Sequence, residues 1–200
     1  MKKLLLTLTV IAIVAASTYA QLSGGVKAGL NLTNEKLKVE SISQSGDMKV
    51  GFLIGGYLTA PLAEKLAIQP ELFFATGGAK YSTDSTGGKV NLGYISVPVL
   101  VRYNLTENIN IQVGPQLGFL LSAKAKPDGG DSQDVKDSYK GIDFGVAAGL
   151  GLEFGAFNAS ARYYLGLANT GDFGDTGDFD VKQTNSAIQL SVGYRLFGGE

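Results

Sequence analysis

Apolar and polar residues alternate along eight stretches of this chain between residues 24 and 197. In residues 95–103, for example, Ile95, Val97, Val99, Val101 and Tyr103 alternate with Ser96, Pro98, Leu100 and Arg102. Because side chains of a strand point alternately to its two faces, each set occupies one face. We therefore predict eight β-strands, over roughly residues 24–33, 48–60, 65–76, 89–103, 108–122, 140–154, 156–168 and 184–197.

The segments between these strands are alternately long and short. The long ones are residues 34–47, 77–88, 123–139 and 169–183, and the short ones are residues 61–64, residues 104–107 and Gly155. Long loops on the outside and short turns on the periplasmic side are typical of an outer-membrane barrel. An even number of strands then places both ends of the barrel domain in the periplasm.

The two faces of each strand differ in a way that favours a membrane barrel over a soluble one. In residues 109–121, the apolar face is almost uninterrupted, whereas the other face carries Asn110, Gln112, Gly114 and Gln116. A soluble lipocalin-like barrel, the alternative, would bury the apolar face and turn a charged face to water. The sparse, glycine-rich polar face suits the inside of a narrow barrel. We predict an all-β, eight-stranded, antiparallel, up-and-down transmembrane β-barrel.

Aromatic residues near the predicted strand ends would mark the two membrane interfaces. Those expected at the periplasmic interface are Tyr103, Phe154, Phe157 and Tyr194, and those at the outer interface are Phe74, Phe119 and Phe144.

The first twenty residues have the features of a secretory signal peptide. Lys2 and Lys3 precede an apolar segment of thirteen residues, 4–16, and a small residue, Ala20, offers a cleavage site. We predict that residues 1–20 are removed and that residues 21–200 form the barrel domain; an uncleaved N-terminal anchor is the alternative. The predicted location is the cell outer membrane.

Composition narrows the chemistry. The 200 residues include no Cys and no His, which excludes a Cys/His zinc site and any hydrolase that needs a histidine base. The formal net charge is −1, so a nucleic-acid partner is not indicated. We expect no catalysis, no cofactor and no metal site, although a carboxylate pair such as Glu71 and Glu153 could act as acid and base.

Several segments look like those of a known family. Residues 92–103 (LGYISVPVLVRY) resemble the YLEIPLLLKY strand of the outer membrane protein beta-barrel domain family, in its PorT-like group. Residues 68–74, 113–118, 143–154 and 162–167 resemble further segments of that family in the same order. The resemblance implies an OmpA/OmpX-like barrel of eight strands, in a family whose members mostly have no defined activity. PorT itself is implicated in a secretion and gliding apparatus.

The polar faces place charged side chains inside the predicted barrel. These are Lys27, Lys49, Glu71, Arg102, Asp143, Glu153, Arg162 and Arg195. The interior of an eight-stranded barrel is just wide enough to be filled by side chains, and buried charges must pair. We predict a structural charge cluster made by Glu71, Arg102, Asp143, Glu153, Arg162 and Arg195. A gated ion path through the same residues is the alternative.

The four long loops are where binding to a partner is expected. In residues 169–183, the candidate interaction residues are Asp172, Phe173, Asp175, Asp178 and Phe179, because exposed aromatic residues often anchor partners. Asp128, Asp131 and Asp134 recur at every third position of residues 123–139. We interpret these acidic loops as solvated, with a calcium ion as the alternative.

The predicted function is a structural or surface-interaction role through the extracellular loops. A narrow ion or solute channel and an accessory component of a secretion or gliding complex are the alternatives. The expected partners are outer-membrane lipid and the barrel assembly machinery, because residues 191–197 resemble the C-terminal signal which that machinery reads, although the chain runs three residues further. A monomer is expected, and the sequence does not identify which extracellular or periplasmic protein would be a partner.

Overall fold

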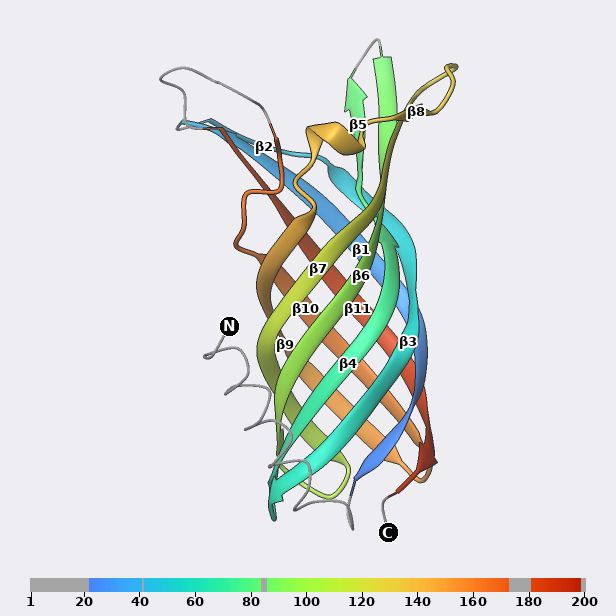
Figure 1. The fold of residues 1–200 in the computed structure, drawn as a ribbon, viewed down its shortest axis with the longest axis vertical. Coiled ribbons are helices and arrows are strands. Elements are labelled where there is room, and N and C mark those ends of the chain that lie inside the picture. The colour runs from blue at the N-terminus through green and yellow to red at the C-terminus, as the bar shows by residue number, and fades with distance from the viewer. Residues whose placement is uncertain (1–21, 41, 84–85, 173–180, 199–200) are drawn as a thin grey trace, which may run out of the picture.

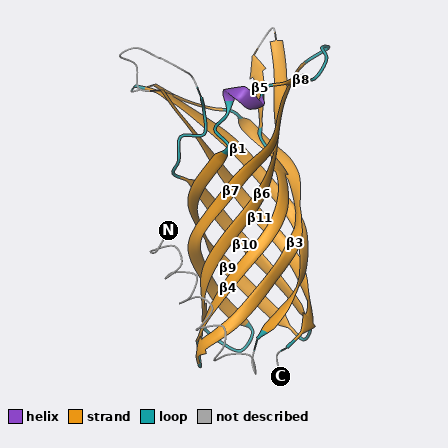
Figure 2. Ribbon diagram, viewed as in Figure 1, coloured by secondary structure: helices purple, strands orange, loops and turns teal. Residues whose placement is uncertain are grey.

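The computed structural model describes residues 22–40, 42–83, 86–172 and 181–198 (Figure 1). Eight long strands form the wall: β1 (Ser23–Val39), β3 (Asp47–Ala63), β4 (Leu66–Gly77), β6 (Thr86–Asn104), β7 (Ile109–Pro127), β9 (Ile142–Phe154), β10 (Phe157–Gly166) and β11 (Val181–Phe197). The shorter elements are β2 (Ile42–Ser45), β5 (Ala79–Thr83), β8 (Gln133–Asp134) and the 3-10 helix η1 (Lys136–Ser138), all at one end of the barrel (Figure 2). Within the described residues, no helix is long and apolar enough to cross a membrane.

The long strands pair antiparallel in a closed ring. The order around the ring is β1, β11, β10, β9, β7, β6, β4 and β3, and β3 pairs again with β1. Ala28, for example, lies opposite Val192 on one side and Ile54 on the other. Because closure pairs the backbone groups of every wall strand, the ring meets the main requirement for crossing a bilayer. The predicted eight-stranded up-and-down barrel is confirmed.

Large apolar side chains cover the outside of the ring. Leu196, Leu72 and Val192 are 61%, 58% and 56% exposed, whereas Asn110 and Gln112 on the inside are 1% and 3% exposed. This arrangement is the reverse of a soluble protein, and it is stable where hydrocarbon surrounds the wall. The structure therefore has the inside-out character predicted from the strand faces.

Aromatic residues meet at both edges of this apolar surface. At the end with short turns, the ring of Phe157 lies 6.3 Å from that of Phe154 and 5.1 Å from that of Tyr194. Toward the opposite end, the rings of Phe52 and Phe74 are 5.9 Å apart. Of these, Phe52 was not among the residues expected at an interface.

At the end with long loops, the strands continue beyond the predicted boundaries. β1 continues to Val39, six residues past its predicted end, and β7 continues to Pro127, five past its own. Residues 34–39 and 42–45, predicted as loop, are instead strand. We call residues 34–39, 42–45, 79–83, 86–91, 123–127 and 181–187 the outer extensions. Their outward side chains include Lys36, Lys38, Lys89 and Lys126 in place of apolar residues.

Candidate functional site

Polar side chains fill the lumen in four groups, ordered from the short turns to the outer extensions. The first is an ion pair, the second a buried ion-pair layer, the third a small cavity and the fourth a carboxylate held by the outer extensions. Each group joins strands that are not neighbours in the ring, so together they close the barrel across its width.

The ion pair nearest the short turns joins Arg102 of β6 and Glu153 of β9. The Nη1 atom of Arg102 lies 2.6 Å from Oε1 of Glu153, and its Nε donates to Oδ1 of Asn104 at 3.0 Å. Arg195 lies at the same end but donates to the carbonyl oxygen of Gly155 at 3.1 Å. In the part of the chain that the structure describes, Arg195 forms no ion pair.

The second group, which we call the central layer, consists of Lys27, Gln69, Glu71, Gln112 and Arg162. Arg162 donates to both carboxylate oxygens of Glu71, at 2.7 and 2.8 Å, and Lys27 donates to the same carboxylate at 2.6 Å. Gln69 donates to Glu71 at 2.8 Å, and Gln112 accepts the Nε hydrogen of Arg162 at 2.7 Å. The side chain of Glu71 is fully buried. Such a bidentate, charge-assisted pair is strong and rigid.

Glycines make room for the central layer. A β-carbon at Gly149, which faces Arg162 across β9 and β10, would lie 2.6 Å from the Cα of Arg162. A side chain at position 149 would collide with the backbone of Ala161 and Arg162, so β9 and β10 could not keep the close pairing that places Arg162 in the central layer. The glycine-rich inner face noted in the sequence therefore lets long charged side chains cross the lumen.

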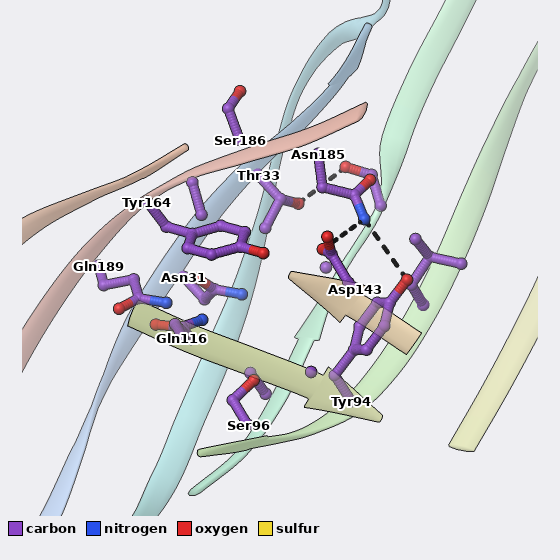
Figure 3. Close-up of a pocket in the computed structure, with 16 residues that line it drawn as sticks. Asn31, Thr33, Tyr94, Ser96, Gln116, Asp143, Tyr164, Asn185, Ser186 and Gln189 are labelled. Carbon is purple, nitrogen blue, oxygen red and sulfur yellow. Dashed lines mark hydrogen bonds between the residues drawn. The ribbon is translucent and has the colours of Figure 1, made fainter. Parts of the chain in front are cut away.

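Beyond the central layer lies a cavity of about 50 Å³ (Figure 3). Asp143 and Asn185 lie on one side, with Nδ2 of Asn185 donating to Asp143 at 3.0 Å, and Gln116 and Gln189 lie on the other. The remaining carboxylate oxygen of Asp143 and the amide oxygens of Gln116 and Gln189 have no protein partner. A polar cavity of this size holds roughly three to five water molecules.

The fourth group centres on Glu35, which is 2% exposed. Its Oε2 atom accepts hydrogen bonds from the hydroxyl groups of Tyr81 and Tyr139, at 2.9 and 3.2 Å, and from Nε2 of Gln183 at 2.9 Å. Glu35 lies on β1, Tyr81 lies on β5, Tyr139 directly follows η1, and Gln183 lies near the start of β11. One carboxylate thus joins segments from all four outer connections, and we call this group the Glu35 junction.

The pKa values of the Tyr81 and Tyr139 hydroxyl groups are raised above the ordinary value for tyrosine. Burial is the larger cause, and the negative charge of Glu35 is the second. Both hydroxyl groups therefore keep their protons at neutral pH and can donate to Glu35. The sequence analysis missed this junction because Glu35 was assigned to a loop. The available signal was that Lys27, Asn31 and Glu35 continue one inward series of alternate positions on β1.

Backbone hydrogen bonds tie the third and fourth outer connections together next to the Glu35 junction. The amide of Lys140 donates to the carbonyl of Thr170 at 2.8 Å, and that of Asp172 donates to the carbonyl of Ser138 at 2.9 Å. Asp172, a predicted interaction residue, is exposed at this contact. The other four, Phe173, Asp175, Asp178 and Phe179, lie outside the described residues.

The acidic residues of the third outer connection are exposed. Asp128, Asp131 and Asp134 point to solvent, and Oδ1 of Asp134 accepts the backbone amide hydrogen of Lys136 at 2.9 Å. Across the described ranges, no three or more Asp, Glu, His or Cys side chains are grouped as metal ligands would be.

Of the six residues in the predicted charge cluster, the structure joins four in two separate pairs. Glu71 pairs with Arg162, and Arg102 pairs with Glu153. Asp143 is held by an amide, and Arg195 by a backbone carbonyl. Lys27 completes the central layer, whereas Lys49 donates to the carbonyl oxygen of Gly77 at 2.6 Å.

A sequence model of the outer membrane protein beta-barrel domain family matches residues 17–172. The chain belongs to this family. The match confirms the resemblance at the level of the family and supports placement in the outer membrane, without distinguishing the PorT-like group. No curated protein matches the sequence.

Solved structures of small outer-membrane barrels share the fold. Ail of Yersinia pestis is 16% identical with a TM-score of 0.51, covering 88% of this chain and 99% of its own. Neisserial surface protein A is 15% identical with a TM-score of 0.51, covering 86% and 96%. OprG of Pseudomonas aeruginosa is 12% identical with a TM-score of 0.50, covering 90% and 97%. At these identities the likeness concerns the fold alone.

Proposed function

We propose that this protein is a closed outer-membrane barrel that acts through the surface formed by its outer extensions, in a structural or surface-interaction role. The observation that carries the proposal is the Glu35 junction. By joining segments from all four outer connections, it turns them into one ordered platform, and pre-ordered surfaces bind with a smaller entropic cost than loose loops.

The central layer supports the same proposal from inside the barrel. Lys27, Glu71 and Arg162 come from β1, β4 and β10, and their side chains meet in the middle of the lumen. An ion crossing this layer would have to separate a buried bidentate pair. Ail, which shares the fold, is named the attachment invasion locus protein and has been solved in complex with the heparin analogue sucrose octasulfate.

Because the chain has no Cys, single cysteines give unique attachment points for a crosslinker. We would introduce Lys136→Cys in the third outer connection and, as the matched control, Glu64→Cys in the short turn between β3 and β4. With a photoactivatable thiol reagent on intact cells, the proposal expects a crosslinked product from Lys136→Cys and none from Glu64→Cys.

A second variant tests whether the crosslinked product depends on the platform ordered by the Glu35 junction. Adding Glu35→Ala to Lys136→Cys should abolish the crosslinked product, while the protein still shows the mobility of a folded barrel in unheated gels. Absence of any product from Lys136→Cys in native cells, or a product that survives Glu35→Ala unchanged, would contradict the proposal.

A narrow channel is the second candidate, favoured by the cavity between the central layer and the Glu35 junction. Planar-bilayer recording separates the two functions. The closed barrel should give no conductance steps above background, whereas steps from the wild-type protein would favour the channel. Co-purification from native outer membrane tests the remaining alternative, an accessory place in a secretion or gliding complex.

A further inference from the structure

Three lysines lie side by side on the outward face of the outer extensions. Lys80 of β5 is directly opposite Lys89 of β6, and Lys89 is directly opposite Lys126 of β7. All three are exposed, and none forms an ion pair among the described residues. Like charges directly opposite one another across strands are destabilising. We call these residues the lysine row.

The acidic groups nearest in the strand register do not neutralise this row. Asp47 is opposite Lys80, and Asp134 is opposite Lys124, which adds a fourth lysine to the same surface. Neither carboxylate forms an ion pair in the described part of the chain. No carboxylate is paired with Lys89 or Lys126 in the register. Asp128 is a third carboxylate near the row, because its side chain lies against Gly87, two residues from Lys89. Among the described residues, four lysines therefore face three carboxylates, which leaves an excess of one positive charge.

Next to the lysine row, on the side toward the apolar surface, the wall has a groove of about 630 Å³. Its lining includes Phe52, Phe74, Gly93, Ser122 and Lys124. Gly93 lies between Phe74 and Ser122, whose atoms lie 3.5 and 2.8 Å from the place of a β-carbon there, so these two side chains close over Gly93 and leave no room for a larger residue at that position. Gly93 and Lys89 are four residues apart on β6, or about 13 Å.

The groove and the lysine row lie where the outward side chains of the wall change from apolar to charged. Going outward along β6 from the short turns, the outward residues Val97 and Ile95 come first and Gly93 next. Lys89 lies four residues N-terminal to Gly93, farther from the short turns. Apolar side chains face hydrocarbon, whereas lysines stand at the level of lipid headgroups, where they attract negative charge. A ligand that fits both parts has an acyl chain and an anionic phosphate about 13 Å apart or less.

We propose that this groove and the lysine row bind one phosphorylated lipid of the outer leaflet. Its acyl chain packs against Phe52 and Phe74, and its phosphate faces Lys89 and Lys126. This inference rests on the membrane location of the family and not on the proposed surface-interaction role. A result that contradicts one of these two proposals therefore leaves the other unaffected.

Native mass spectrometry of the full barrel in detergent tests the proposal with defined lipids. The probes are diphosphoryl lipid A and zwitterionic phosphatidylethanolamine, with inorganic phosphate as the competitor. The wild-type barrel should retain lipid A in preference to phosphatidylethanolamine. Lys89→Gln with Lys126→Gln should weaken lipid A binding roughly ten- to thirtyfold, because each lysine near a lipid surface contributes about 1 kcal/mol.

Two further variants make the result specific. Lys136→Gln with Lys140→Gln removes the same charge from the third outer connection and should leave lipid A binding unchanged. Ser122→Phe fills the groove without touching the lysine row and should weaken lipid A binding. Each variant is first shown to fold by its mobility in unheated gels.

Three outcomes would overturn the proposal. One is equal retention of phosphatidylethanolamine and lipid A by the wild-type barrel. Another is unchanged lipid A binding in the Lys89→Gln, Lys126→Gln variant. The third is full competition by inorganic phosphate together with no effect of Ser122→Phe, which would identify a site for free anions.

Discussion

At the scale of single residues, the carboxylate of Glu71 balances the charges of two buried cations. Its carboxylate is the only acidic group within ion-pair distance of Lys27 and Arg162 among the described residues. All three side chains are at least nine-tenths buried. Removing the negative charge leaves two cations facing each other in the lumen, and an uncompensated buried charge is strongly destabilising.

We therefore predict that Glu71→Gln lowers the free energy of unfolding by about 3–5 kcal/mol. Glu153→Gln is the matched control, since its partner Arg102 is partly exposed and such pairs contribute about 1 kcal/mol or less. Urea unfolding of the refolded barrel in lipid vesicles measures both. Equal losses in the two variants would show that the central layer is not specially stabilised.

Tyr81 supplies a prediction about pH. Its pKa is raised, first by burial and then by the charge of Glu35, above the ordinary value of 10.0 that it regains on unfolding. Below about pH 10, both states keep the proton and stability does not change; above it, the unfolded chain loses the proton first, so stability falls as pH rises. Between pH 9 and pH 11, wild-type protein should lose more unfolding free energy than Tyr81→Phe. An equal loss in both proteins would contradict this prediction.

At the scale of elements, the outer extensions depend on side-chain contacts more than the wall does. The wall strands are paired on both sides all around the ring, whereas β2 pairs only with β1 and β8 only with β7 among the described strands. The side chain of Glu35 joins these extensions across the barrel mouth, beside the backbone hydrogen bonds between the third and fourth outer connections. Losing the contacts of Glu35 should loosen the extensions while the wall persists, because local unfolding follows local contact energies.

Glu35→Ala tests this separation. It removes three hydrogen bonds, each with a net contribution of about 1 kcal/mol, and leaves their donors unpaired. We expect trypsin to cleave at lysines of the outer extensions and outer connections faster in the variant, with the wall still protected. Lys36→Arg, at the next and outward-facing position of β1, keeps a trypsin site and is the control, which should keep the wild-type cleavage rate. Equal rates in Glu35→Ala and wild type would assign the order of the extensions to their backbone pairing.

In the outer extensions, the strands could not be predicted from the sequence pattern. Lipid demands an apolar residue at alternate positions, so residues 109–121 could be recognised as a strand from their pattern alone. Above the hydrocarbon both faces of a strand can be polar, and Lys36 and Lys38 gave no period-two signal although they lie in β1. The inner face could be predicted from parity. Which charges pair could not, because Arg162 and Glu71 meet across the ring and their pairing depends on strand tilt and register.

At the scale of the whole molecule, ring closure bears on oligomeric state. Within the described residues, each of the eight wall strands has two neighbours, so the wall offers no free edge to a second copy. We expect the barrel to behave as a monomer, as the sequence analysis also expected. Sedimentation in detergent of matched density measures the protein mass directly, and a concentration-independent dimer would contradict the expectation.

The pairing of β1 with β11 has a consequence for how the barrel is made. Leu30 lies opposite Leu190, so the earliest wall strand finds one of its two partners only when the latest has been synthesised. Until then both strands carry a row of unpaired backbone groups, and contacts between such distant parts of a chain form slowly. A newly exported chain must therefore be kept apart from other unfolded chains until its final strand pairs with β1. The chain is most prone to aggregation between export and that last pairing.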